Sequence, residues 1–333
     1  MHFILNRFRR SARQWMGLAI SVIAGLGISS CATIATQDAA KRLAQTAGLI
    51  DEVKSFGRTL GIEPTQALSK TVRDGPPLGM LWIWMQREGT LALSAPMDIR
   101  MAIGYAAEKE RLRIEQVYRV DGYSVYYRQG NEFADSRSLA TASFADEPIL
   151  RRVKVILHED LHGDINFALP WEIEEGIATP LGSLAAVEYF RWKGDENNLR
   201  NAASSVIQER QASRELNLLA AQAQNIFAQE PVEIAKEKIL ALLDNYPAYQ
   251  KQFERQVRSQ HVLTVLEAKL SHDLAYYRYY DSIAALAELA PNLKTLIGDL
   301  KQIPANATIP IVDEFLRNLE NKYGAGNNGR SAP

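Results

Sequence analysis

Residues 158–162 read His-Glu-Asp-Leu-His, and these residue types at this spacing could bind a metal ion and support hydrolysis. On a helix, His158 and His162 lie on the same face, so both imidazoles can reach one metal ion while Glu159 lies beside it. Metal-activated water with a glutamate base is the chemistry of zinc hydrolases. The alternative is a helix whose two histidines only cap it or face solvent, so the neighbouring sequence must decide.

A third ligand is expected from residues 171–179, which contain Glu175 and Thr179. A catalytic zinc ion takes three protein ligands and keeps one position open for water. After a short connection, a second, antiparallel helix would present Glu175 to the metal, and Thr179, one turn on, would orient a ligand. The alternative is that Glu172, Glu174 and Glu175 form a solvated acidic first turn, which the helix dipole favours.

The segment before the first histidine carries helical signals of its own. Asp146 can cap its N-terminus, and Pro148 is tolerated in a first turn. Apolar residues then recur at helical spacing until Gly163; they are Ile149, Val153 and Ile156. We therefore predict a helix over residues 149–162 that positions the pentapeptide without help from a metal.

Helical periodicity also dominates the rest of the chain. An N-terminal helix is predicted over residues 38–60. After Glu147, the predicted helices are 149–162, 172–179, 184–192, 196–227, 232–243, 249–289, 293–301 and 311–322. Two runs rich in aromatic and β-branched residues, 81–84 and 117–127, predict a small sheet, with a helix over 97–113 between its strands.

These elements predict an α+β fold in which helices predominate. We expect the small sheet of the N-terminal half to pack on the helix that bears the two histidines, followed by a helical C-terminal half. Residues 31–145 and 146–323 are expected to form one domain. Residues 324–333 are rich in Gly and Asn and are predicted to be a disordered tail.

The first 30 residues have the pattern of a cleaved leader. Four arginines precede an uncharged apolar run at 15–28, which is shorter than the usual membrane span of 18 or more residues. The run ends at Ile-Ser-Ser-Cys, which resembles a bacterial lipoprotein cleavage box and implies a lipid on Cys31. Ala32 after it implies an outer-membrane protein facing the periplasm. The alternatives are an uncleaved span or a chance cysteine after an ordinary secretory signal.

Composition narrows the function classes. The 38 Lys and Arg residues balance 39 Asp and Glu residues, giving a net charge of −1, so we expect no nucleic-acid partner. With 47% hydrophobic residues in 333, the chain can bury a sizeable core. Cys31 is the only cysteine, so an internal disulfide and a cysteine zinc cage are excluded. Any metal must be held by histidines and carboxylates, and oligomeric state is not indicated.

The pentapeptide, followed thirteen residues later by Glu175 within Glu-Glu-Gly-Ile-Ala-Thr, resembles the gluzincin metallopeptidases. Among these it is most similar to the bacterial putative-aminopeptidase lipoproteins. The resemblance implies that His158, His162 and Glu175 bind one zinc ion per chain. It further implies that Glu159 is the general base that hydrolyses a peptide or protein substrate.

The same resemblance implies a role for three residues that precede the histidine helix. It also shows two positions at which this sequence differs from the usual pattern of that family. Gly122, Tyr123 and Ser124 would lie on the strand that edges the substrate. Asp160 replaces an apolar residue, and Glu174 stands where Asn is more usual in that family. These departures leave the expected fold in place and affect the expected substrate preference.

A donor for the developing oxyanion is expected from a tyrosine-rich C-terminal segment. The candidates are Tyr276, Tyr277, Tyr280 and His272, which lies one turn before Tyr276. The alternative is that these tyrosines belong to an amphipathic packing face. His261 is expected to be structural or exposed.

Two functions follow from the sequence. The first is a lipid-anchored zinc peptidase, with aminopeptidase activity as one option and Glu172, Glu174 and Asp121 as candidates to hold a free amine. The second is a non-catalytic periplasmic lipoprotein scaffold with a vestigial or structural zinc site. A structural zinc site normally has four protein ligands, and only three are identified, which favours catalysis.

Overall fold

The computed structural model describes residues 29–72, 80–92, 102–103, 116, 122–130, 138–162, 166–257 and 260–328. Contacts divide the chain into two units, Met1–Asp38 and Ala39–Pro333. The predicted leader, residues 1–30, therefore lies almost wholly outside the described residues. Of the helices that the structure describes, none combines the length and apolar character needed to cross a membrane.

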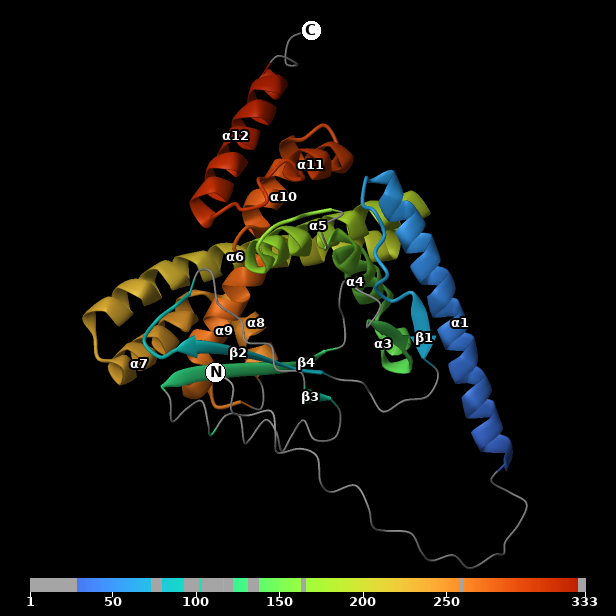
Figure 1. Cartoon of the computed structure of the whole chain (residues 1–333), viewed down its shortest axis with the longest axis horizontal. Helices are drawn as coiled ribbons and strands as arrows, with labels where there is room; N and C mark the ends of the chain where they lie inside the picture. Colours follow the sequence, from blue (N-terminus) through green and yellow to red (C-terminus); the bar gives the residue numbers. More distant parts are fainter. Residues whose placement is uncertain are drawn as a thin grey trace, which may run out of the picture. The chain divides into compact units, whose positions relative to one another are not determined.

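The first helix, α1, runs from Ser29 to Thr59 (Figure 1), so the expected helix at 38–60 is present and begins earlier. Leu43, Ile50 and Val53 are buried along one face. Gly61 ends the helix with a φ of +82°, and the Ile62 amide donates to the Gly57 carbonyl at 3.0 Å. This is a Schellman closure, which favours glycine at the left-handed position.

The strands form two small sheets. β2 (Met80–Arg87) lies between β3 (Ala102–Ile103) and β4 (Tyr123–Gly130), all antiparallel, while β1 (Lys70–Val72) pairs in parallel with β5 (Leu139–Thr141). β2 and β4 run side by side (Figure 1), and in their register Trp84 pairs with Tyr126. The strand predicted at 81–84 is confirmed. Of the run predicted at 117–127, residues 123–127 are in a strand, and residues 117–121 lie outside the described residues. The helix expected at 97–113 is wrong at 102–103, because these residues pair with β2; most of that segment is outside the described residues.

The helices of the second half follow the predicted pattern with two differences. They are α3 (Ala142–Asp146), α4 (Ile149–Leu161), α5 (Trp171–Lys193), α6 (Glu196–Gln229), α7 (Val232–Leu242), the short 3-10 helix η2 (Leu243–Asn245), α8 (Pro247–Val257), α9 (Val262–Tyr277), α10 (Tyr280–Leu289), α11 (Leu293–Leu300) and α12 (Ile309–Asn328). The helices predicted at 172–179 and 184–192 are one helix, because α5 continues through Pro180. The helix predicted at 249–289 is three, with breaks after Val257 and at Tyr279, which has φ −94° and ψ 1°.

Two terminal details also differ from expectation. Asp146 does not cap α4: it ends α3 and pairs with Arg42, and the N-cap position of α4 is Pro148, which makes no side-chain cap. Residues 324–328, expected in a disordered tail, continue α12, and 329–333 lie outside the described residues. The predominantly helical α+β class is confirmed.

α5 is the central helix of the described fold (Figure 1). It packs against α4, α6, α9 and α10. The three-stranded sheet packs mainly against α9 and not, as predicted, on the helix that bears the two histidines. One core cluster joins α1, α4, α5 and α10–α12, and a second joins β2 and β4 to α6–α9. The second half of the chain therefore brings α4, α5 and α9 together, and these helices carry the candidate functional residues.

Candidate metal centre

The two histidines of the pentapeptide lie at the C-terminal end of α4. His158 is helical, whereas His162 is the C-cap residue with extended backbone. Their rings meet edge to face with centroids 4.6 Å apart, and the two Nε2 atoms are 3.1 Å apart. The i and i+4 positions thus bring both imidazoles to one point, as the sequence predicted.

Glu175 on α5 faces both histidines. Its Oε2 atom lies 3.2 Å from His158 Nε2 and 3.4 Å from His162 Nε2. The two helices approach closely here because α5 has glycine at position 182, where a Cβ would lie 3.1 Å from His158 Cβ and 3.2 Å from its Cα. The three atoms therefore converge because α4 and α5 cross closely at Gly182, and a larger residue there would increase the distance between the two helices.

These three atoms fit a tetrahedral metal ion. With bonds of about 2.0–2.2 Å, the ligand atoms of a tetrahedral zinc ion lie about 3.3–3.6 Å apart. The three separations here, 3.1, 3.2 and 3.4 Å, come close to one face of such a tetrahedron. Glu175 Oε2 is also buried, and the two imidazole Nε2 atoms lie within 3.4 Å of it without making a well-directed hydrogen bond, so a cation shared by the three atoms would compensate its charge.

Glu174 supports His162 from its other side. Its Oε1 atom lies 2.7 Å from His162 Nδ1, so the imidazole donates there and its Nε2 faces His158 and Glu175. Glu174 is therefore a carboxylate partner of His162, and this contact engages Oε1 of a residue that was a candidate to hold a substrate amine.

The charges at the centre favour a cation. Burial opposes the charged form of His162, but the carboxylates of Glu175, Glu174 and Glu159 outweigh it and raise its pKa well above the usual value. Burial also opposes ionisation of Glu175, yet His162 and His158 hold its pKa well below the usual value. The three groups together therefore favour a positive charge between them, which a metal ion would supply in place of a proton.

Glu159 and Tyr276 border the same space. Glu159 is buried on α4, and its charge acts on both His162 and Tyr276. Burial and the neighbouring carboxylates of Glu175 and Glu159 raise the pKa of the Tyr276 phenol well above 10. Tyr276 is therefore the member of the tyrosine-rich segment that lies at the candidate centre, and it keeps its proton.

The other predicted oxyanion donors lie elsewhere. Tyr280 is fully buried in a cluster with Val206 and Ala284, and burial and Glu209 raise its pKa. Tyr277 packs beside the second core cluster, and its carbonyl accepts from Ser213. These two assignments are wrong. Tyr277 follows Tyr276 directly in α9 and so points in another direction, and Tyr280 begins α10 after the break at Tyr279.

α9 approaches α5 over Gly176. A Cβ on this residue would lie 3.0 Å from the Ala275 carbonyl oxygen and from the Tyr279 ring. Tyr276 is next to Ala275 in the chain. The glycine of the Glu-Glu-Gly-Ile-Ala-Thr segment therefore permits the close crossing that carries Tyr276 to the ligands.

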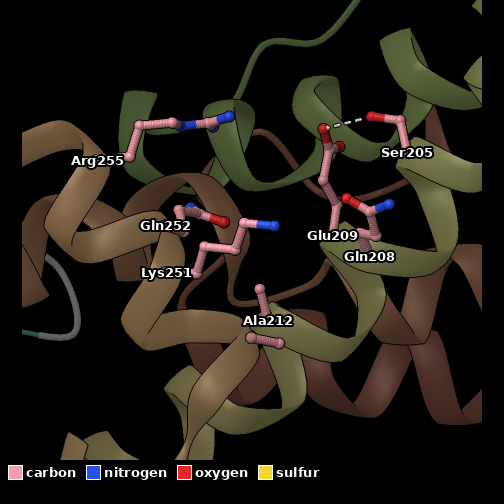
Figure 2. A pocket seen from close by; sticks show the side chains of 8 residues that line it. Ser205, Gln208, Glu209, Ala212, Lys251, Gln252 and Arg255 are labelled. Carbon is pink, nitrogen blue, oxygen red and sulfur yellow. Dashed lines mark hydrogen bonds between the residues drawn. The ribbon is translucent and has the colours of Figure 1, made fainter.

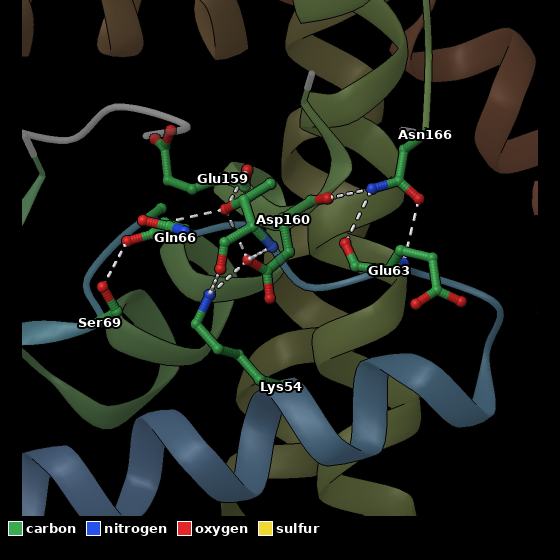
Figure 3. Close-up of polar contacts among 9 residues, drawn as sticks. Lys54, Glu63, Gln66, Ser69, Glu159, Asp160 and Asn166 are labelled. Carbon is green, nitrogen blue, oxygen red and sulfur yellow. Dashed lines mark hydrogen bonds and ion pairs between the residues drawn. The ribbon is translucent and has the colours of Figure 1, made fainter. Parts of the chain in front are cut away.

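Asp160 has a structural role that the sequence did not indicate. Its Oδ1 atom lies 2.5 Å from Lys54 Nζ and accepts hydrogen bonds from the amide and hydroxyl of Thr65, both at 2.9 Å (Figure 3). Asn166 in turn donates to the Asp160 carbonyl at 2.5 Å. The acid therefore ties the turn between the two histidines to α1 and the loop after it, and it does not face a substrate.

Thr179 does not orient a ligand by hydrogen bonding. Its Oγ1 atom is buried without a hydrogen-bond partner among the described residues, and its carbonyl accepts from Ser183. Position i+4 places it on the same face of α5 as Glu175, but its hydroxyl makes no hydrogen bond to that carboxylate. Of the other candidate amine-holding groups, Asp121 lies outside the described residues.

The segment 122–124 begins β4, which is the last strand in the order β3-β2-β4. Gly122 has a φ of +75°, and Ser124 Oγ donates to the Thr264 carbonyl at 3.1 Å. The Gln260 side chain pairs with Tyr127, accepting from its amide at 3.2 Å and donating to its carbonyl at 3.0 Å. This part of the outer edge of β4 is therefore covered by a side-chain amide.

A separate cleft lies between α6 and α8. Figure 2 shows Glu209 and Gln208 on one side and Lys251, Gln252 and Arg255 on the other. Glu209 is already paired with Lys154 at 2.6 Å and with Ser205 at 3.1 Å. The described residues of this cleft include none of the three candidate metal ligands.

The chain was compared with family models, curated proteins and solved structures, and no match was found in any of them. What can be said of the site therefore comes from its own residues.

Proposed function

We propose that this protein is a zinc-dependent peptidase. The observation that carries the proposal is the convergence of His158 Nε2, His162 Nε2 and Glu175 Oε2 within 4.8 Å of one another, on helices that also bring Glu159 and Tyr276 to the same space. Three protein ligands leave one tetrahedral position open, which is the arrangement of catalytic rather than structural zinc.

Zinc bound there would lower the pKa of a water molecule and polarise the scissile carbonyl. Glu159 accepts the proton of the attacking water on its carboxylate and passes it to the amine that leaves. Tyr276, which keeps its phenolic proton, donates to the carbonyl oxygen as negative charge develops there. Glu174 holds His162 in the tautomer that leaves Nε2 free to bind the metal.

Digestion of a peptide library, analysed by mass spectrometry, tests the proposal. The purified protein should bind one zinc ion per chain and cleave peptides, lose cleavage with a chelator and recover it with zinc. Glu159→Gln should keep the zinc and lose cleavage, whereas Glu175→Gln should lose both. Glu172→Gln, on the same helix turn, is the matched control for metal binding and should keep the zinc. Peptides with free and with acetylated amino termini in the same library separate aminopeptidase from endopeptidase activity.

A wild-type protein that binds zinc with full occupancy but cleaves nothing in this library would contradict the peptidase proposal. It would favour the scaffold function with a structural site.

We further propose that the protein is anchored to the outer membrane by a lipid on Cys31 and faces the periplasm. The support is the leader pattern and the position of Cys31 at its end. Two or more acyl chains give stable anchoring, since each buried CH₂ adds about 0.8 kcal/mol. Labelling with radioactive palmitate in a bacterial host should mark the wild type and not Cys31→Ser, and label on the variant would contradict the proposal.

A further inference from the structure

A buried polar cluster on α9 lies beside Tyr276. His272 is 3% exposed, and Lys269 and Asp273 are fully buried. Asp273 Oδ1 lies 2.8 Å from His272 Nδ1, while its Oδ2 accepts from the Tyr249 hydroxyl at 2.7 Å and pairs with Lys269. Both carboxylate oxygens are therefore engaged, so the carboxylate is fixed in orientation.

Asp273 sets the tautomer of His272. Although burial opposes ionisation, Lys269 and His272 lower the pKa of Asp273 to about 2, so it is a carboxylate that only accepts. The His272 proton is therefore on Nδ1, and Nε2 carries the lone pair. Burial lowers the pKa of His272 to about 4, which keeps the ring neutral. A neutral ring with this tautomer has no Nε2 proton to give, so His272 is not an oxyanion donor.

The His272 ring makes three aromatic contacts. It lies edge-on to Trp84 at 4.3 Å and 82°, edge-on to Tyr126 at 5.0 Å and 62°, and tilted by 31° against Tyr276 at 4.8 Å between centroids. Its Nε2 is buried with no hydrogen-bond partner among the described residues. The ring is therefore held by its hydrogen bond to Asp273 and by its contacts with Trp84 and Tyr126 of the sheet. Its third aromatic contact is with Tyr276.

Arg128 of β4 contributes to the same arrangement. Its guanidinium carbon lies 5.7 Å from the centre of the Tyr276 ring and 5.8 Å from that of Trp84. Tyr276 thus has a histidine and a cation within about 6 Å of its ring, both carried by elements that do not supply the metal ligands. His272 and Arg128 therefore flank the ring of the tyrosine whose hydroxyl interacts with Glu175.

The geometry points to His272 as a positioning residue: held in plane by Asp273, its ring sets the rotamer in which the Tyr276 hydroxyl faces the ligand triangle. This inference rests on the proposed peptidase function for its kinetic consequence, but the orientation of Tyr276 can be measured without catalysis. A misplacement of about 1 Å in a catalytic group can cost up to about 100-fold in rate.

Two variants test separately the aromatic ring of His272 and its hydrogen bond to Asp273. His272→Phe keeps an aromatic ring and removes the donor to Asp273, whereas His272→Asn keeps a donor for Asp273 and removes the ring. At saturating zinc, we expect each to lower kcat about 10- to 100-fold with KM and zinc content unchanged. His261→Phe, at the exposed start of the same helix, is the control and should leave kcat unchanged.

The independent readout is the ¹⁹F spectrum of 3-fluorotyrosine placed at position 276 alone. The wild type should give one resonance that moves when zinc binds, and both His272 variants should give a shifted or split resonance whose response to zinc is reduced. Because His272→Asn leaves Asp273 partnered, it should remain folded by circular dichroism even if His272→Phe does not.

The inference is overturned if His272→Asn keeps the wild-type ¹⁹F resonance and its response to zinc, because the ring would then not set the rotamer. A protein without peptidase activity that still shows the altered resonance in His272→Asn would contradict the proposed function and leave the positioning role supported. The two failures are therefore distinguishable.

Discussion

The Lys54 ammonium lies 2.5 Å from Asp160 Oδ1, with side-chain exposures of 11% and 2%. This buried pair connects α1 to the residue between Glu159 and Leu161, within the pentapeptide itself. Burial raises the pKa of Asp160, against the effect of Lys54 and Thr65, so the pair holds a carboxylate in an unfavourable environment. Removing one partner leaves the other charge buried and unpaired.

Lys54→Met is therefore expected to destabilise the protein by about 3–5 kcal/mol, as for other broken buried pairs. Urea unfolding followed by circular dichroism measures the change. Lys193→Met is the matched control: Lys193 pairs with Glu52 at 2.9 Å, but both side chains are more than a third exposed. Its cost should be about 0–1 kcal/mol, and equal costs for the two variants would contradict the role assigned to Asp160.

The hydrogen bond from His162 to Glu174 predicts an effect on metal affinity. Loss of a carboxylate that orients a histidine ligand typically weakens metal binding about 10- to 100-fold. Glu174→Leu should show this loss in a competitive chelator titration, and Glu174→Gln, which keeps an accepting oxygen, should lose less. Glu172→Gln should bind zinc as the wild type does. An unchanged affinity in Glu174→Leu would show that the 2.7 Å contact does not support the ligand.

The sequence predicted the ligand triangle because it depends on local spacing. Two histidines four residues apart on a helix share a face, and a carboxylate on the next antiparallel helix faces them. The helical class was predicted for the same reason, since periodicity is a local signal. Breaks within 249–289 were missed because apolar periodicity continues across Tyr279 although its backbone leaves the helix.

Contacts between distant segments could not be predicted in this way. Lys54 and Asp160 are 106 residues apart, and nothing in the local sequence of either indicates the other. An acid at position 160, where an apolar residue was expected, indicated a special role for this residue. It did not indicate which residue would pair with it. The choice among Tyr276, Tyr277 and Tyr280 likewise required the crossing of α9 over Gly176, which is a tertiary feature.

The close helix crossing at Gly182 predicts that two similar glycine substitutions have opposite effects on stability. Gly182→Ala would place a methyl group 3.1–3.3 Å from His158 Cβ, Cα and N, none of which can move without shifting α4. We expect a loss of about 1–3 kcal/mol in stability and weaker zinc binding, since the separation between His158 and Glu175 would grow. Gly298→Ala in α11 has no atom within 4 Å of its added methyl group and should stabilise by up to about 1 kcal/mol. Thermal unfolding of both variants checks this, and a neutral Gly182→Ala would contradict the close crossing.

The depressed pKa of His272 predicts how stability depends on pH. Burial lowers this pKa to about 4, whereas the unfolded chain has a value of about 6.5, so the unfolded state takes up the proton first as pH falls. The contribution of neutral His272 to the free energy of unfolding is therefore fully present above pH 6.5 and is lost as pH falls from there towards 4. The free energy of unfolding should fall by roughly 2 kcal/mol between pH 7 and 5 from this group. His272→Asn removes this titration, so its stability should fall less over that interval. Urea unfolding of both proteins at pH 7 and 5, with chelator present to exclude metal effects, measures the difference. Parallel losses in the two proteins would show that His272 is not buried in its neutral form.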